Sequence, residues 1–592
     1  MPALNLRIAA LLLACAPLHA LAFAPSDADK RFQAIYEKEW TWRQEQTGQA
    51  DEDSDTSGDN TRLPDVGAPA QQARLKVWEQ VLKDLDGIDP AGLSAENRIN
   101  LAIYRPQVEN LAAEVRLRAY EMPFNSDSSF WSNLSFMARR QMKTADDYRA
   151  YAARLRDVPR HFDQHIANMR AGLARGFTVP RAVLDGRDVS IAAVAELKDP
   201  EQSAFYAPYR KMPARIPAAE QEALRAEARA AIREHVVPAF GTLLTFFRTE
   251  YVPKARTTLA AEAMPGGKDF YAQQIREYTT LDLSAEQIHQ IGLSEVARIR
   301  AAMEQARQAT GFDGDLPAFF EHVRTGPEFY YSKPEDLIGH FERIEKKVWE
   351  RMPQLFSRRP RAAFELRPLP ALGDQRGTGY YRAGPPDASE PGVLFFNMAM
   401  LNTRPIPTLE TLQLHEGVPG HHYQISLVQE DESLPDLLRF GQVPATAYTE
   451  GWGLYAESLG QELGMFSDPY QWFGHLDMEM LRAVRLVVDT GLHALQWDRQ
   501  RAIDYMLANT SMAPRDVAVE IDRYISNPGQ ACAYKVGHNE WVRLREKAKT
   551  SLGSRFDIKG FHDTVLGGGA LPLTLLERRV DQWIAKEKAK QA

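Results

Sequence analysis

Leu412-Gln-Leu-His-Glu-Gly-Val-Pro-Gly-His-His-Tyr-Gln424 is the stretch around which the rest of the chain is organised. It places three histidines, His415, His421 and His422, and the carboxylate of Glu416 within eight residues, between apolar neighbours and at the end of a segment with helical character. Imidazole and carboxylate groups at this density are typical of a metal site.

The spacing in this stretch departs from the usual zinc-hydrolase motif, His-Glu-x-x-His. In that motif two histidines four residues apart lie on one helical face, and the glutamate between them is the general base. Here Pro419 stands four positions after His415. In a regular helix neither His421 nor His422 would share a metal with His415. Because Pro419-Gly420 removes a backbone donor and permits unusual dihedral angles, we expect the helix to break there and to return His421, in preference to His422, beside His415.

A third protein ligand is expected from a second helix, since catalytic zinc is held by three side chains. The segment Ala447–Glu457 contains Glu450, 35 residues after His415, and Glu457, seven residues further on the same helical face. Its small and aromatic residues, such as Gly451 and Trp452, favour close packing over exposure. We therefore predict Glu450 as the metal ligand and Glu457 as the carboxylate that orients a ligand histidine.

Glu416 is the group that would accept a proton from water and pass it to a leaving amine. Arg485, Asp489 and His493 recur every four residues on an otherwise apolar helix. If buried, they would satisfy one another, and such a network could lie near the site; if exposed, they would carry little meaning. Further candidates for contacts around the metal or the substrate are His422, Gln530, Lys535 and Asn397.

Composition fits an ordinary globular protein, with 592 residues, 44% hydrophobic and 25% charged. The net charge is −8 at pH 7 and no long basic run is present, which argues against a nucleic-acid partner. We find no internal repeat and no convincing linker. One helical, metallopeptidase-like domain over residues 23–592 is the simplest organisation.

The first 22 residues read as an export signal. Arg7 precedes an apolar run too short to span a membrane, and Ala20-Leu-Ala22 offers small residues to a signal peptidase. We expect cleavage after Ala22 and a periplasmic or secreted protein without a membrane span. The alternative is a lipid anchor at Cys15, because Leu12-Leu-Ala-Cys15 resembles a lipoprotein processing site.

Helical periodicity and composition dominate the chain outside residues 363–398. Ser284 and Gln287 form a capping box that predicts a helix running to about residue 310. Segments 364–368, 379–382 and 393–397 are aromatic or branched and bounded by Gly and Pro, which predicts short strands. We therefore predict a mainly α fold with a small sheet directly before the histidine-rich stretch. Its edge either receives a substrate strand or forms a structural hairpin.

The motif His415-Glu-Gly-Val-Pro-Gly-His421 resembles the His-Glu-x-x-Pro-Gly-His motif of the bacterial proteins known as domain of unknown function 885. Segments similar to other signatures of this family extend over most of the chain: Glu250–Arg256, Tyr271, Tyr278–Thr280, Ile288–Glu295, Thr449–Tyr455, Asp489–His493, Pro528–Gln530 and Tyr534-Lys535. Within the family an aromatic residue can follow the second histidine of the motif, which further favours His421 over His422.

The resemblance implies a large helical ellipsoid with a deep cleft, similar to the gluzincin peptidases thimet oligopeptidase, carboxypeptidase Taq and angiotensin-converting enzyme. It also implies Tyr534 as donor to the oxyanion. The combined prediction is an exported zinc peptidase that hydrolyses short peptides, with one Zn²⁺ held by His415, His421 and Glu450. The alternatives are a metal-dependent hydrolase of another amide, such as a peptidoglycan stem fragment, and a catalytically inactive periplasmic peptide-binding protein.

Overall fold

The computed structural model describes residues 26–47, 61–126, 128–369, 379–434, 436–440 and 445–590. The predicted export signal, its cleavage site and Cys15 lie outside these residues. The predicted mainly α fold is confirmed, since 71% of the described residues are helical and 3% are in strands. No described helix has the length and apolar character needed to cross a membrane.

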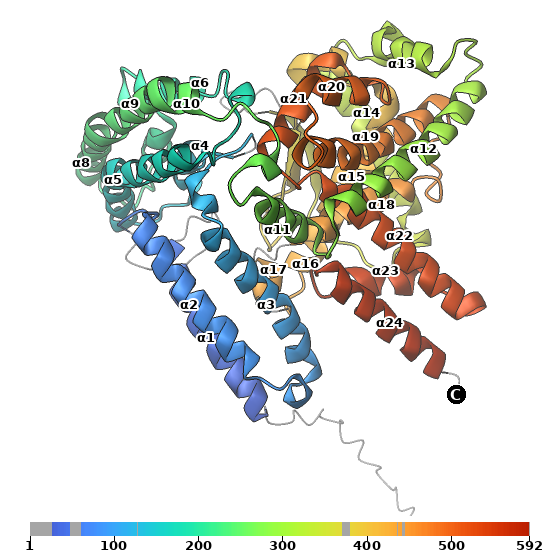
Figure 1. Cartoon of the computed structure of the whole chain (residues 1–592), viewed down its shortest axis with the longest axis horizontal. Helices are drawn as coiled ribbons and strands as arrows, with labels where there is room; N and C mark the ends of the chain where they lie inside the picture. Colours follow the sequence, from blue (N-terminus) through green and yellow to red (C-terminus); the bar gives the residue numbers. More distant parts are fainter. Residues whose placement is uncertain are drawn as a thin grey trace, which may run out of the picture.

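The N-terminal helices lie side by side and share a small apolar core of their own (Figure 1). They are α1 (Asp27–Thr47), α2 (Ala68–Asp86) and α3 (Ala95–Arg116). Glu39 of α1 is buried in this core, where it accepts hydrogen bonds from Trp78 Nε1 at 3.0 Å and Tyr104 Oη at 2.8 Å. These bonds join one residue from each helix, so the three helices are held as a unit.

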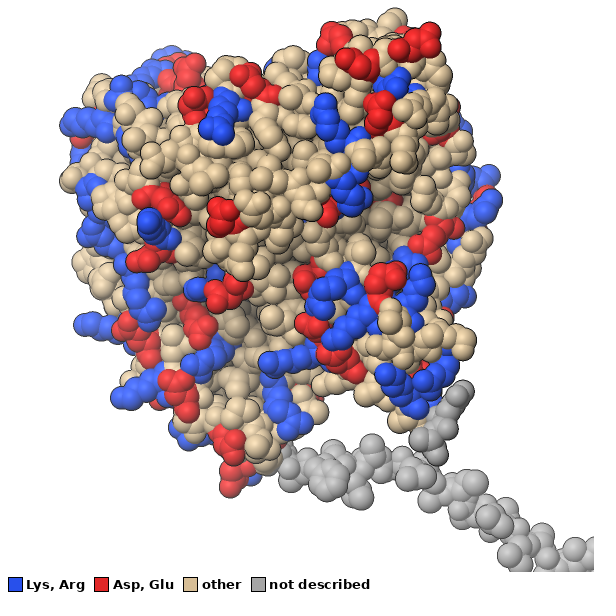
Figure 2. All heavy atoms as spheres, turned by 45° about the vertical axis from the view of Figure 1, so that its right-hand side comes forward, with Lys and Arg blue, Asp and Glu red and all other residues tan. Residues whose placement is uncertain are grey.

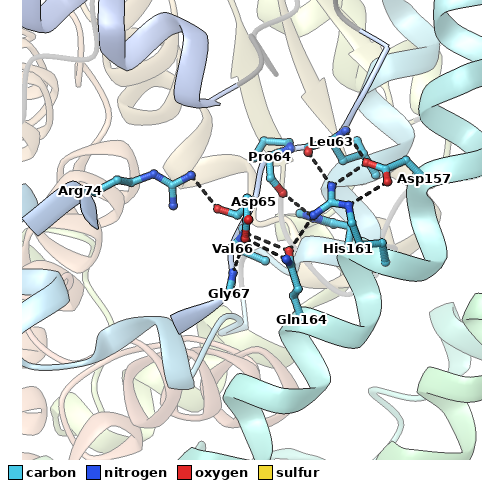
Figure 3. A network of polar contacts seen from close by, with 10 residues as sticks. Leu63, Pro64, Asp65, Val66, Gly67, Arg74, Asp157, His161 and Gln164 are labelled. Atoms are coloured by element: carbon cyan, nitrogen blue, oxygen red, sulfur yellow. Dashed lines mark hydrogen bonds and ion pairs between the residues drawn. The ribbon is translucent and has the colours of Figure 1, made fainter. Parts of the chain in front are cut away.

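A short extended segment, Leu63–Gly67, fastens these helices to α5 (Ala145–Arg175). Figure 3 shows this segment running along α5, with its backbone groups paired to α5 side chains. The Leu63 amide donates to Asp157 at 2.8 Å, and the Pro64 carbonyl lies 3.1 Å from His161 Nδ1. Because the segment has no helix or strand of its own, side chains satisfy its backbone groups.

The middle of the chain forms a second group of helices, and the C-terminal part forms a third (Figure 1). The largest apolar core contains residues of both groups, and a further core lies mainly within the C-terminal part. The middle group comprises α4 (Phe130–Asn133), α5, α6 (Val189–Ala195), α8 (Ala218–Ala231) and α9 (Val237–Phe246). The C-terminal part comprises α11 (Gly267–Thr279), α12 (Ala285–Ala309), α13 (Leu316–Thr325), α14 (Pro334–Arg351), α15 (Leu409–Glu416), α16 (His421–Gln429), α18 (Thr446–Ser458), α19 (Pro469–His493), α20 (Arg499–Leu507), α21 (Pro514–Ser526), α22 (Cys532–Leu552), α23 (Ile558–Leu566) and α24 (Leu573–Ala589).

The predicted capping box is confirmed: Ser284 Oγ accepts from the Gln287 amide, and Gln287 Oε1 accepts from the Ser284 amide. The helix that follows, α12, packs along α19, the most completely buried helix of the C-terminal part. Gly292 of α12 permits this, because a Cβ there would lie 2.8 Å from Leu486 and Val487. Helix α19 is thereby a fixed support for the elements packed on its other sides.

Helices α18 and α22 cross at a pair of glycines. A Cβ on Gly537 of α22 would lie 2.0 Å from the carbonyl oxygen of Ala447, and one on Gly451 of α18 would lie 2.7 Å from Gly537 Cα. The backbones therefore approach more closely than any larger residue would allow. This crossing fixes the helix that carries Glu450.

The small sheet lies beside α16, as expected. Strands β1 (Phe364–Pro368), β2 (Gly379–Arg382) and β3 (Gly392–Phe396) correspond to the three predicted segments. The strand order is β1-β3-β2, with β1 parallel and β2 antiparallel to β3, so β1 and β2 are the edges. Acidic and basic side chains are interspersed over the face drawn in Figure 2.

Candidate metal centre

The histidine-rich stretch forms two helices with a break between them, as Pro419-Gly420 predicts. Helix α15 ends at Glu416 and α16 begins at His421. Gly417 has φ −97° and ψ −113°, Gly420 has φ −76° and ψ −133°, and the Val418–Pro419 peptide bond is cis. These angles lie outside the α region, so the chain reverses its course between the two helices.

Two contacts hold the break in place. A Cβ on Gly420 would lie 1.8 Å from the carbonyl oxygen of His415, so only glycine permits this return of the chain. The indole of Trp452, on α18, donates a hydrogen bond to the Pro419 carbonyl at 2.8 Å. Helix α18 therefore fixes the turn that separates the two histidines, and it also carries Glu450.

His415, His421 and Glu450 converge on one point. One ligand atom from each lies within 4.8 Å of the other two. Glu450 Oε2 lies 3.4 Å from His415 Nε2 and 3.4 Å from His421 Nε2. The two imidazole rings are nearly perpendicular, with an interplanar angle of 82° and centroids 4.6 Å apart.

This donor set fits a four-coordinate divalent metal. Metal–ligand bonds of 2.0–2.2 Å in a tetrahedron place neighbouring ligand atoms about 3.3–3.6 Å apart, and both distances from Glu450 Oε2 are 3.4 Å. Glu450 Oε2 is buried without a hydrogen-bond partner, although a buried carboxylate oxygen normally has one. Three protein ligands would leave a fourth position open for water or substrate.

The electrostatics of the three residues favour a positive charge between them. Burial opposes ionisation of Glu450, but the neighbouring imidazoles outweigh it and hold the pKa of this carboxyl well below its usual range. Burial likewise opposes protonation of His415, yet the adjacent Glu450 and Glu457 carboxylates raise the pKa of His415 to about 9. A cation at this point would replace the proton that these groups attract.

Glu457 lies against the opposite side of the His415 ring, with Oε1 2.7 Å from Nδ1. The Nδ1–H of His415 therefore donates to Glu457, and Nε2, which faces Glu450 and His421, is the atom that would bind a metal. Both side chains are almost fully buried. The structure thus brings Glu457 to the position predicted for a carboxylate that orients a ligand.

His422 points away from the other two histidines. Its Nε2–H donates to the Ala362 carbonyl at 3.1 Å, and its Nδ1 accepts from the Tyr381 hydroxyl at 3.0 Å. Burial lowers the pKa of His422 to about 4, so the ring is neutral at pH 7. With both nitrogens engaged by the sheet and the segment before it, His422 is a structural residue rather than a ligand.

Glu416 is half-buried at the end of α15. Burial is the main cause of the raised pKa of Tyr381, and the negative charge of Glu416 adds to it. The same charge also contributes to the raised pKa of His415. Tyr381, on the edge strand β2, is a neighbour of the site that the sequence analysis missed. The strand pattern places it in the predicted sheet but does not show that its hydroxyl contacts His422.

Tyr534 and Gln530 lie in the packing of α19, α21 and α22. The Arg485 guanidinium stacks 4.4 Å above the Tyr534 ring, and Gln530 Nε2 donates to the Tyr534 hydroxyl at 3.4 Å. Among the described residues, no hydrogen bond or ion pair joins Tyr534 to His415, His421 or Glu450. Tyr534 therefore lies near the start of α22, where its contacts are to Arg485 of α19 and to Gln530.

Lys535 was predicted to lie near the metal or substrate, and the structure places its ammonium among three core side chains. Its side chain is 0% exposed, and its ammonium donates to Glu479 at 2.6 Å and to His538 at 2.9 Å and pairs with Glu295 at 3.1 Å. Three acceptors satisfy its three donors. Lys535 is thus held inside the core, where substrate cannot reach it.

Arg485, Asp489 and His493 are buried, and their partners lie on neighbouring helices. Arg485 donates to Tyr524 at 2.8 Å, Asp489 accepts from the Tyr271 hydroxyl at 2.7 Å, and His493 Nε2 donates to the Tyr524 carbonyl at 2.9 Å. Their burial is as expected, but the three side chains bond to α11 and α21 rather than to one another. Asn397 is also buried and accepts from the Ala399 amide at 3.2 Å, which caps the turn after β3. These contacts hold elements of the fold together.

Arg482, one turn before Arg485, is a second residue that the sequence analysis missed. Its guanidinium lies 3.4 Å from Glu457 Oε1. Arg485, Asp489 and His493 follow one another at intervals of four residues, and position 482 is not part of that series. Residues three positions apart also share a helical face, so a search at this interval from Arg485 includes Arg482.

Comparison with known proteins places the chain in a family. The sequence matches the family described as bacterial protein of unknown function (DUF885) over residues 45–580. The chain belongs to this family, as the motif predicts. No match is found among curated proteins.

Two solved structures share the fold. A candidate lipoprotein from Colwellia psychrerythraea is 28% identical, with a TM-score of 0.86 over 95% of this chain and 100% of that one. A candidate lipoprotein of unknown function from Shewanella oneidensis is 16% identical, with a TM-score of 0.69 over 93% of this chain and 99% of that one.

Proposed function

We propose that this protein is an exported, zinc-dependent peptidase that hydrolyses short peptides. The observation that carries the proposal is the convergence of His415 Nε2, His421 Nε2 and Glu450 Oε2 at the spacing of a tetrahedral site, with Glu450 Oε2 buried and without a hydrogen-bond partner. The resemblance to gluzincin peptidases that the family motif implies is in keeping with this proposal.

His415, His421 and Glu450 would hold the ion, and Glu457 would keep His415 in the tautomer that binds metal. Bound Zn²⁺ would polarise the scissile carbonyl and lower the pKa of water at the open position. Glu416 would take a proton from that water on its carboxylate and deliver it to the leaving amine. Tyr534 is the proposed hydrogen-bond donor to the oxyanion.

The proposed location is the periplasm or the exterior of the cell, with or without a lipid anchor at Cys15. The composition of residues 1–22 supports export. The similarity to the candidate lipoprotein from Colwellia psychrerythraea supports the anchored form.

Metal analysis of the purified protein, combined with peptide hydrolysis by Glu416→Gln, tests the proposal. We expect about one Zn²⁺ per chain in the wild type and in Glu416→Gln, with hydrolysis reduced at least about 100-fold in the variant, because general acid–base catalysis contributes that much. Glu410→Gln is a matched control, since Glu410 lies on the same helix but accepts from the Phe466 amide. Absence of stoichiometric metal, together with unchanged hydrolysis by Glu416→Gln, would overturn the proposal.

Substrate panels separate the alternatives. Short peptides and peptidoglycan stem fragments are offered to the zinc-loaded protein in parallel. Turnover of the stem fragments alone would favour the hydrolase of another amide. Tight peptide binding without turnover of either class would favour a catalytically inactive binding protein.

A further inference from the structure

We propose that Arg482 is a positioning residue of the metal centre, which holds the Glu457 carboxylate so that Glu457 in turn orients the His415 imidazole. This inference rests on the proposed function, because it concerns the same metal centre. It assigns to α19 a part in metal binding, although α19 provides no ligand.

The contacts form a continuous buried chain. Arg482 Nη2 lies 3.4 Å from Glu457 Oε1, and the same oxygen lies 2.7 Å from His415 Nδ1. The exposed fractions of the three side chains are 6%, 1% and 3%. Water is therefore not available to replace either partner of Glu457.

Charge balance explains why an arginine is needed here. A carboxylate buried without a cation is strongly disfavoured, and the loss of one partner of such a pair leaves an uncompensated charge. Two groups contact this carboxylate, His415 at 2.7 Å and Arg482 at 3.4 Å. His415 would be neutral when it binds a metal, whereas Arg482 is permanently charged.

Arg482 is itself fixed in place. Its Nη1 donates to the Met478 carbonyl at 2.9 Å, one turn earlier on α19. The neighbouring charges on this helix have other partners: Glu479 pairs with Lys535 and Arg485 with Glu520. Glu457 is the single carboxylate that pairs with Arg482 among the described residues. The geometry thus assigns Arg482 to Glu457 alone.

A double-mutant cycle on Zn²⁺ affinity tests this assignment. Affinity is measured by competition with a chromophoric chelator for the wild type, Arg482→Met, Glu457→Gln and the double variant. Outer partners of metal ligands contribute about 10- to 100-fold to metal affinity. We expect Arg482→Met to weaken binding about tenfold, Glu457→Gln to weaken it at least as much, and the double variant to match Glu457→Gln, because Arg482 acts through Glu457.

Arg485→Met is the matched control for loss of a buried arginine. Arg485 lies one turn along the same helix, is equally buried and pairs with Glu520. We expect it to lower the melting temperature and leave Zn²⁺ affinity unchanged. Equal affinity losses in Arg482→Met and Arg485→Met, or losses that multiply in the double variant, would overturn the inference while leaving the metal centre intact. A wild type that binds no stoichiometric Zn²⁺ would overturn both the inference and the proposed function.

Discussion

Gly453 lies directly against the imidazole of His415, because a Cβ at position 453 would be 2.6 Å from Cε1 and 2.9 Å from Nδ1 of that ring. The space that a side chain would fill on α18 is occupied by a proposed metal ligand. Helix α18 therefore contributes to the centre twice: it carries Glu450, and it lacks a side chain three residues later.

Gly453→Ala tests this relationship. The added methyl group would displace His415 from Glu457 and Glu450, so we expect Zn²⁺ affinity to fall at least about tenfold, as for other disturbances of ligand orientation. Chelator competition measures it. Gly241→Ala is the control, since nothing lies within 4 Å of its added Cβ on α9. Unchanged affinity in Gly453→Ala would show that His415 does not bind the ion in this orientation.

His421 and His422 are adjacent, yet their contacts predict opposite outcomes for substitution. His421→Gln should abolish stoichiometric Zn²⁺ binding, because His421 Nε2 lies 3.4 Å from Glu450 Oε2. His422→Gln should keep the metal but lower the melting temperature, because His422 bridges Tyr381 and Ala362. Metal analysis and thermal unfolding of the two variants measure these effects. Retention of metal in His421→Gln would remove His421 from the ligand set.

The crossing of α18 and α22 predicts a cost for any side chain at Gly537. Gly537→Ala would place a methyl group 2.0 Å from the Ala447 carbonyl oxygen. Forcing the helices apart should lower the free energy of unfolding by about 1–3 kcal/mol or more, as overpacking does. Denaturant unfolding measures this, with Gly241→Ala again as the control. A loss below about 0.5 kcal/mol would mean that the crossing is not closely packed.

Stability should fall in acid because of His562. Its ring is 0% exposed, its Nδ1–H donates to the Leu355 carbonyl, and its Nε2 accepts from Tyr455. Burial lowers the pKa of His562 to about 3. The neutral ring is favoured in the folded state, so its contribution is complete above pH 6.5 and is lost as the pH falls toward 3.

When the pH is lowered from 6.5 to 5, the protonation of this one histidine in the unfolded state should reduce the free energy of unfolding by about 2 kcal/mol. His562→Asn keeps a donor near Leu355 but does not titrate. It should be less stable than the wild type at pH 7, yet lose about 2 kcal/mol less over the same interval in denaturant unfolding. Equal losses in the two proteins would assign the acid sensitivity to other groups.

The sequence predicts most of the secondary structure here because the signals are local. Ser284 and Gln287 form the capping box of α12, and the three strands correspond to segments bounded by Gly and Pro. The break at Pro419-Gly420 is likewise a local effect of backbone chemistry, and it explains why His421 rather than His422 faces Glu450.

Contacts between distant segments are not predicted in this way. Tyr381 and Arg482 lie beside the metal centre only because the sheet and α19 pack against it. The partners of Lys535 are hidden for the same reason: a charged residue near a predicted catalytic tyrosine suggests substrate contact, whereas its ammonium pairs with Glu479 and Glu295 in the core. Periodicity places a residue on a face of a helix but does not reveal what covers that face.

The hydrogen bond from Trp452 to the Pro419 carbonyl gives the centre a spectroscopic reporter that is independent of any bound ion. The indole proton is held at a donor–acceptor distance of 2.8 Å within a fully buried site. It should therefore give a single, slowly exchanging resonance in a nuclear magnetic resonance spectrum. That resonance reads out the geometry of the turn in the apo protein, so a lost ligand can be distinguished from a lost turn.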